Sequence, residues 1–387
     1  MRQWRFLIVV AIATAAAVVP AVSLSAKSDW SVSVTARGLD SPRGLAFAPN
    51  GTLYLAEGGH GGDACNSGPR GPVCIGTSSR ISRVDPATGA VTPVVSGLFS
   101  VSTGNDGITG VDGVAAGGGK LLAVMTGYPQ QFAAFSCAGR PADCSTSLAA
   151  ARDQAGDLIS FTPGGTRKTI AEVGTDDYTW SLTNTSFTRS PPNSNPYGVY
   201  AVAAGAYVAD AGTNVLDFVG ANGDRSIISA DPLPAAGGFP GDGVPTCVTV
   251  DRGNVYAADL AGRLWKRDGS FTPTQVPVVD GGGASLIHHV TGCAADGDGN
   301  IFLVDMWGTP GPPIPAGPAS VANTGSVVEL KKDGSAVVVA AGLDFPNGIA
   351  VAKDGSLYVT TKSICTAQGT PLPSCGQGGQ LVHLQTG

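Results

Sequence analysis

Short apolar runs, each followed by a polar turn and a second apolar run, recur along this chain. Six segments share this pattern: 42–57, 110–126, 195–210, 244–259, 290–305 and 346–361. Turns such as PNG, KDG and GDG place Asn-Gly or Asp-Gly at the tip, which is the strongest local signal for a β-hairpin. Val, Leu, Ile, Tyr and Phe fill the flanking runs, as strands prefer. The pattern therefore predicts six hairpins.

Each of the first five hairpins is followed by a second pair of apolar runs, at 80–95, 157–173, 214–229, 263–279 and 326–342. Four antiparallel strands per repeated unit are typical of a β-propeller blade. The last unit has one further run only, QLVHLQ at 380–385. Residues 31–36 supply the missing strand, because SVSVTARGL near the start matches SAVVVAAGL at 335–343. We predict an all-β fold, a six-bladed propeller whose N-terminal strand closes the last blade.

Several of these runs carry motifs beyond the bare pattern. YVADAGTNVLDFV looks like an NHL-type blade, and SNPYGVY, VPTCVTV, YAADL, VTGCAADGDGNIFLVDM and PNGIAV follow one another along the chain. Together they resemble the ScyD/ScyE family of exported propellers over nearly the whole mature chain. The resemblance implies a secreted NHL-like propeller. That family is associated with pigment (scytonemin) gene clusters, also occurs far outside them, and has no agreed biochemical activity.

The first 26 residues have the organisation of a secretory signal. Arg2 and Arg5 precede an apolar run at 6–19, and small residues follow Pro20. A positive start, a short apolar core and a small-residue end are typical of a signal peptide. We predict a signal at 1–23, with cleavage between 21 and 26, and a single domain at 24–387. The mature protein is then secreted, extracellular or periplasmic, with no membrane anchor.

Composition narrows the range of partners. The chain has 56 glycines, 13% charged residues and a net charge of −6. Without a basic block, nucleic acid is disfavoured as a partner. No Ser/Pro-rich linker divides the chain, and we expect a monomer.

The long connections of the repeat all fall on one face of the predicted ring, opposite the short hairpin turns. They comprise 58–79, 127–156, 306–325 and 362–379, with the blade connections 174–194 and 230–243. Eight cysteines in an exported chain favour disulfides. Three pairs fall within single loops, Cys65–Cys74, Cys137–Cys144 and Cys365–Cys375. Cys247 and Cys293 lie on neighbouring inner strands, one alignment column out of phase, as a fourth disulfide or two buried thiols.

Carboxylates end the second strand of four blades: Glu57, Asp210, Asp259 and Asp305. A ring of oxygen ligands at the channel mouth suits Ca²⁺, whereas the alternative is that each carboxylate caps a turn of its own blade. His60, His288 and His289 are alternative Zn²⁺ ligands. The run 296–300 lacks the glycine and acidic residue of a calcium loop, so we interpret it as a hairpin turn.

Aromatic residues also lie on the loop face, among them Tyr128, Trp180 and Trp307. They either contact a ligand or pack the loops onto the ring. No nucleophile elbow and no zinc-protease motif is present. The leading hypothesis is a binding module that presents a disulfide-stiffened loop face to a protein, glycan or small molecule. The alternative is a Ca²⁺-dependent hydrolase or lyase of the propeller-lactonase type, built on the four carboxylates.

Overall fold

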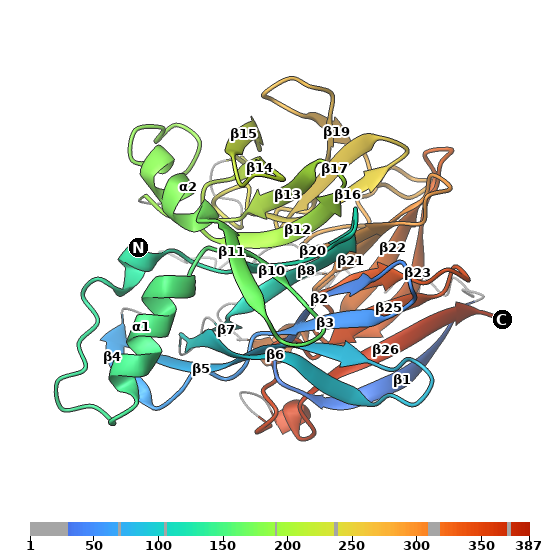
Figure 1. Ribbon diagram of the computed structural model, residues 1–387. Coiled ribbons are helices and arrows are strands. Elements are labelled where there is room, and N and C mark those ends of the chain that lie inside the picture. The colour runs from blue at the N-terminus through green and yellow to red at the C-terminus, as the bar shows by residue number, and fades with distance from the viewer. Residues whose placement is uncertain are drawn as a thin grey trace, which may run out of the picture.

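The structure is a computed structural model that describes residues 30–68, 71–103, 107–189, 192–235, 239–308, 318–369 and 373–387. The predicted signal peptide, 1–23, lies outside the described residues. The segment from residue 30 onwards folds into six antiparallel sheets around a common axis (Figure 1). The predicted six-bladed β-propeller is confirmed.

Each blade has four strands, numbered outward from the axis. The first blade comprises β2 (Pro42–Phe47), β3 (Leu53–Glu57), β5 (Gly71–Val84) and β6 (Val91–Ser102), with β4 (Ala64–Gly68) and β7 (Ile108–Thr109) added at its ends. The second comprises β8 (Val111–Gly117), β9 (Lys120–Met125), β10 (Leu158–Phe161) and β11 (Arg167–Ala171). The third comprises β12 (Pro196–Val202), β13 (Gly205–Asp210), β14 (Val215–Gly220) and β15 (Arg225–Ala230).

The remaining blades repeat the same order. The fourth comprises β16 (Pro245–Asp251), β17 (Asn254–Asp259), β18 (Arg263–Arg267) and β19 (Thr274–Val276). The fifth comprises β20 (Val290–Ala295), β21 (Ile301–Asp305), β22 (Gly325–Leu330) and β23 (Ala336–Leu343). The sixth comprises β24 (Ile349–Val351), β25 (Leu357–Thr361) and β26 (Gly379–Thr386), and its fourth strand is β1 (Trp30–Leu39).

The ring is closed by the N-terminal strand, as the sequence predicts. β1 runs antiparallel to β26, from the pair Trp30↔Thr386 to the pair Leu39↔Gly379. Further bonds hold the connection between β1 and β2: the Ser41 N–H donates to the Cys365 carbonyl at 2.8 Å, and the Ala367 N–H donates to Asp40 Oδ1 at 2.9 Å. The first and last segments of the chain therefore share one blade.

Small residues let the six inner strands approach one another closely around the axis. Five of these strands carry glycine at the same position: Gly44, Gly113, Gly198, Gly292 and Gly348. A Cβ on Gly44 would lie 2.9 Å from the Asp112 carbonyl, and one on Gly113 would lie 2.7 Å from the Tyr197 carbonyl. Each of the five glycines faces the backbone of the next blade, so a side chain at this position would force neighbouring blades apart.

The fourth blade has Cys247 where the others have glycine, and this residue bonds to Cys293 of the fifth blade with a Cα–Cα distance of 5.7 Å. Cys293 is one position further along its strand. Because side chains alternate along a strand, Cys247 faces the next blade while Cys293 faces back. Being out of phase by one column is therefore what lets the two sulfurs meet. The disulfide left open by the sequence is present, as are the three predicted within loops.

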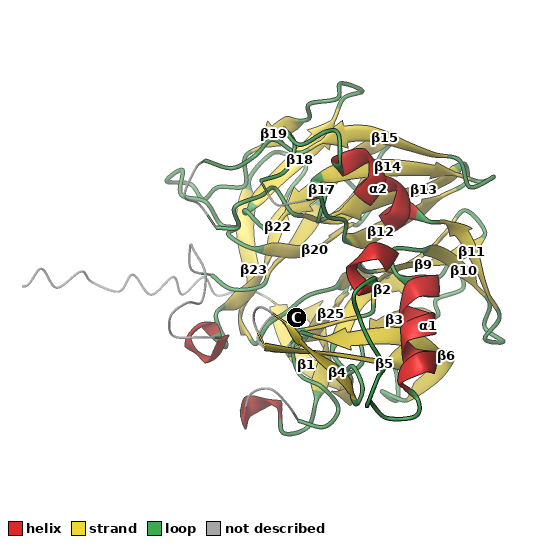
Figure 2. Ribbon diagram, turned by 90° about the vertical axis from the view of Figure 1, so that its left-hand side faces the viewer, coloured by secondary structure: helices red, strands yellow, loops and turns green. Residues whose placement is uncertain are grey.

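The loop face carries two helices, which the sequence analysis did not predict. The connection from β9 to β10 contains η2 (Pro129–Phe132) and α1 (Cys144–Gln154), and α2 (Val173–Ser181) precedes β12. Both α-helices lie on the side of the molecule that faces the viewer in Figure 2. Short 3₁₀ helices, η3 (Pro318–Val321) and η4 (Pro373–Cys375), lie in the connections of the fifth and sixth blades. No helix of the described residues is long and apolar enough to cross a membrane.

Candidate functional site

The carboxylates predicted as calcium ligands each bind groups of their own blade or its entry. Glu57 is fully buried and accepts hydrogen bonds from Arg80 Nε at 2.7 Å, from Ser82 Oγ at 2.6 Å and from the Asp40 N–H at 2.9 Å. Asp210 accepts from the N–H groups of Asn195 and Gly212, both at 2.8 Å. These bonds fix the turns beside each strand end.

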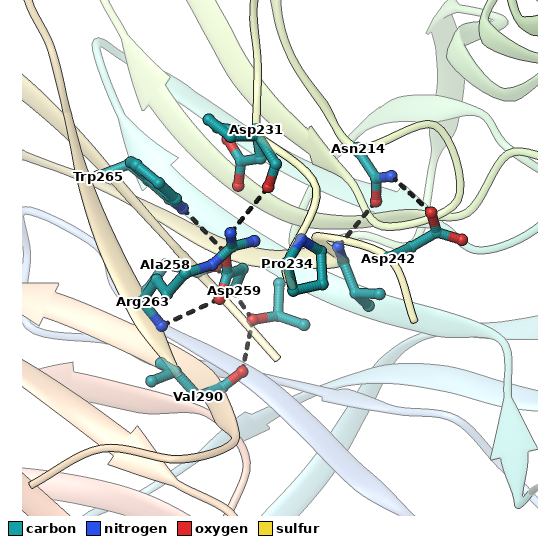
Figure 3. A network of polar contacts seen from close by, with 12 residues as sticks. Asn214, Asp231, Pro234, Asp242, Ala258, Asp259, Arg263, Trp265 and Val290 are labelled. Carbon is teal, nitrogen blue, oxygen red and sulfur yellow. Dashed lines mark hydrogen bonds and ion pairs between the residues drawn. The ribbon is translucent and has the colours of Figure 1, made fainter. Parts of the chain in front are cut away.

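The other two carboxylates follow the same arrangement. Asp259 accepts from Arg263 Nε and Trp265 Nε1, both at 2.8 Å (Figure 3). Burial raises the pKa of Asp259 to about 7, against the opposing charge of Arg263. Asp305 accepts from the backbone N–H groups of His288 and His289, at 3.1 and 2.5 Å. All four carboxylates thus act as turn caps in this structure, and a metal role for them stays a prediction.

The predicted zinc ligands lie on two different blades. His60 Nδ1 is 2.7 Å from Asp40 Oδ2 in the first blade, and His288 Nδ1 is 3.2 Å from Asp305 Oδ2 in the fifth. His289 stacks on Trp307 with 4.2 Å between the ring centroids. Among the described residues, no group of three or more His, Cys, Asp or Glu side chains is arranged to hold a metal ion.

The three aromatic residues predicted on the loop face pack against three different neighbours. Tyr128 stacks on Tyr178 at a centroid distance of 4.7 Å, and Trp180 contacts Phe187 at 5.4 Å. Trp307, on His289, is 7% exposed. A ligand role for these aromatics stays a prediction, and their visible role is to pack loops onto the ring.

A cluster that the sequence analysis did not single out lies inside the channel. Every inner strand has one residue directly before the glycine or Cys247 position, and five of the six are polar or charged without exception of strand entry: Asp112, Tyr197, Thr246, Thr291 and Asn347, with Arg43 as the sixth. The first five line a cavity of about 60 Å³ on the axis. The channel is therefore polar at the level where the inner strands approach most closely.

Arg43 and Asp112 form the charged part of this cluster. Arg43 Nε lies 3.4 Å from Asp112 Oδ1, and a second guanidinium nitrogen of Arg43 donates to the Ile108 carbonyl. Within the described residues, neither carboxylate oxygen of Asp112 has a hydrogen bond of standard geometry. Burial raises the pKa of Asp112 to about 6, although the Arg43 charge and the nearby Thr126 hydroxyl oppose the shift. Asp112 thus retains acceptor capacity inside the channel.

The opposite side of the cluster crosses the axis. Asn347 Nδ2 of the sixth blade donates to the Tyr197 hydroxyl of the third blade at 2.6 Å. Burial raises the pKa of Tyr197, so its hydroxyl stays protonated. Thr246 and Thr291 instead donate to backbone carbonyls of the following blade, at 2.6 Å to Val290 and 3.2 Å to Pro346. The Tyr197–Asn347 pair closes the axis between opposite blades.

The signal for this cluster is present in the sequence. PRG, VDG, PYG, PTC, VTG and PNG open the six hairpins, and the middle letter is the channel residue in each. Alignment of the repeats marks the position, but the pairing of Tyr197 with Asn347 depends on the diameter of the closed ring.

Comparisons with known proteins bear on the fold. No model of a known protein family matches the sequence, and no curated protein matches it. A solved structure of a Bacteroides thetaiotaomicron protein of unknown function has 12% identity, a TM-score of 0.56, and coverage of 92% of this chain and 76% of its own. A gluconolactonase from Xanthomonas campestris has 9% identity, a TM-score of 0.52, and coverage of 92% and 89%. At such identities the likeness concerns fold alone, and the chain is a β-propeller.

Proposed function

We propose that this chain is an exported propeller of the NHL-like, ScyD/ScyE type that binds a protein partner through its loop face. The observation that carries the proposal is a wall on that face, formed by the β4–β5 hairpin of the first blade and α1 of the second. Long loops on a rigid scaffold are where binding residues concentrate. Four disulfides accord with an oxidising compartment.

Two loop disulfides and a set of polar bonds hold the wall. Cys65–Cys74 crosslinks β4 to β5, and Cys137–Cys144 ties the preceding loop to the start of α1. Arg140 donates to Asn66 Oδ1 at 2.9 Å and so joins the loops of two blades. A surface fixed before binding loses less conformational entropy when a partner docks.

The wall also has a core of its own. Leu148 and Ala151 of α1 are buried against Phe99 and Val101 of β6. At the end of the helix, Gln154 Oε1 accepts from the Phe99 N–H at 2.9 Å. The opposite side of α1 is exposed at Thr146 and Ala149, so this side is the surface offered to a partner.

The test introduces charge and bulk on that exposed side. We expect the Thr146→Arg/Ala149→Arg double variant to lose a partner captured by the unaltered chain from the extracellular fraction of its source. Ala87→Arg/Thr88→Arg, in the exposed β5–β6 turn on the opposite face, is the matched control and should retain it. Equal capture by both variants, with unchanged thermal melts, would contradict the proposal.

The hydrolase alternative rests on the predicted carboxylate ring and on the likeness in fold to the Xanthomonas gluconolactonase. In this structure the hydrogen-bonding capacity of those carboxylates is directed to turns and to arginines. A panel of lactones and esters, assayed with Ca²⁺ and with chelator, separates the two functions: Ca²⁺-dependent turnover lost in Asp210→Asn would favour the hydrolase.

A further inference from the structure

The channel contains a second, larger cavity on the side of the hairpin turns. Its volume is about 240 Å³, against about 60 Å³ for the polar cavity above it. Six residues line both cavities, one from each inner strand: Leu45, Val114, Val199, Val248, Cys293 and Ile349. The two cavities are therefore continuous, with an apolar ring between them.

The larger cavity has uncharged walls. Apart from glycine, its described lining consists of aliphatic residues with Phe47, Tyr200, Thr249 and the sulfur of Cys293. Each inner strand is paired on one side only, so its other edge faces the axis. A charged ligand would lose hydration there without an opposite charge to replace it, which is costly. The cavity suits an uncharged molecule with an apolar body.

The polar end of the channel selects a hydrogen-bond donor. Asp112 is 1% exposed, lines the smaller cavity, and has two oxygens without hydrogen bonds of standard geometry. The hydrogen-bonding groups nearest the axis are otherwise directed to protein: Asn347 donates to Tyr197, and Thr246 donates to a backbone carbonyl. A buried carboxylate oxygen without a donor is energetically unfavourable, and a hydroxyl group would satisfy it.

We propose that the channel binds a small uncharged alcohol, which enters from the hairpin-turn side and donates its hydroxyl hydrogen to Asp112. A 150 Å³ apolar cavity accommodates benzene, so a cavity of about 240 Å³ accommodates roughly nine or ten non-hydrogen atoms. Octan-1-ol has this size, with a flexible body and one donor. The proposal is independent of the loop face, which lies at the other end of the channel.

The first experiment measures binding by titration calorimetry at pH 8, with octan-1-ol, its isomer heptyl methyl ether, and octanoate. The alcohol should bind at least about tenfold more tightly than the ether, because the ether cannot donate to the Asp112 carboxylate. Octanoate should bind more weakly than the alcohol, because its charge would enter an uncharged cavity beside an anion. Equal binding of alcohol and ether, or absence of alcohol binding, would overturn the proposal.

Two variants locate the site. Ala116, half-buried, lines the larger cavity, and Ala116→Leu should reduce octan-1-ol affinity at least about tenfold by filling that space. Ala87→Leu, an equal change at an exposed turn, should leave affinity unaltered. Asp112→Asn should remove the preference for alcohol over ether, since an amide can also donate to the ether oxygen.

Thermal melts without ligand show whether each variant folds. Should Ala116→Leu fail to fold, Val351→Phe, at another lining position, serves the same purpose. Unaltered alcohol affinity in a folded cavity-filling variant would overturn the proposal, as would an undiminished alcohol preference in folded Asp112→Asn.

Discussion

Buried aspartates in this propeller divide into two groups by their partners. Asp210 and Asp259 each accept several hydrogen bonds, from backbone N–H groups and from side chains. Asp112 and Asp157 have few bonds, and burial raises their pKa values to about 6 and about 7. An aspartate of the second group weakens the folded state when it is ionised, because desolvation of its charge is not repaid.

Asp157 gives the clearest test of this effect. Its Oδ2 accepts from Thr169 Oγ1 at 2.8 Å, while burial and the nearby charges of Glu172 and Asp153 raise its pKa to about 7. The folded pKa lies above the unfolded value, so this group's contribution is full below about pH 4 and is lost as pH rises through 7. Asp157→Asn should therefore raise the free energy of unfolding at pH 8 by roughly 1 to 3 kcal/mol.

The measurement is urea unfolding of both proteins at pH 8 and at pH 3.5, where the difference should vanish. Asp85→Asn is the control, because hydrogen bonds from the Thr88 hydroxyl and the Ala87 N–H lower the pKa of Asp85. Its variant should gain no stability at pH 8. A gain for Asp157→Asn that is the same at both pH values would show that its charge is not the cause.

Among the larger elements, the strands are predictable from sequence and the loop helices are not. Strand runs such as those of β13 and β17 alternate or remain apolar over five or six residues and end in Asn-Gly or similar turns. The sequence of α1, CSTSLAAARDQ, has few large apolar residues, so little marks it as a helix. Its stability depends on packing against β5 and β6 and on the Cys137–Cys144 bond, which the local sequence does not describe.

The candidate site shows the same limit. The order of residues along each inner strand places Asp112 and Tyr197 at the channel from the repeat alone. Their partners Arg43 and Asn347 come from other blades, and the Asn347–Tyr197 bond spans 150 positions. Which side chains meet across the axis depends on how closely the glycine-bearing strands approach, and this distance results from closure of the whole ring.

The disulfides should differ in their contribution to stability according to the loop each one closes. Cys247–Cys293 spans 46 positions and joins two blades, whereas Cys137–Cys144 spans 7 positions within one loop. By chain entropy, removal of the first should cost about 4 kcal/mol and removal of the second about 2.5 kcal/mol. Urea unfolding of the Cys247→Ala/Cys293→Ala and Cys137→Ala/Cys144→Ala variants, without reductant, checks the order. A larger loss for the loop pair would contradict it.

For the whole molecule, β1 is the strand that completes the ring. Without it, the edge of β26 would be unpaired, and unpaired strand edges promote association between chains. A chain that begins at residue 40 should therefore melt at a lower temperature and aggregate, by light scattering, when compared with a chain that begins at residue 24. Equal melting and scattering of the two chains would show that closure by β1 does not stabilise the propeller.

The same closure has a consequence for the order of events during synthesis. Ser31 Oγ donates to the Gln385 carbonyl, a contact between positions 354 residues apart. At roughly 5–20 residues per second, the ribosome needs about 20 to 70 seconds to make the partner of the first strand. Over that interval the earliest strand has no place to pair, so the sixth blade is assembled last, from the oldest and youngest parts of the polypeptide. Transport of an unfolded chain is compatible with this timetable, because the ring cannot close before translation is almost complete.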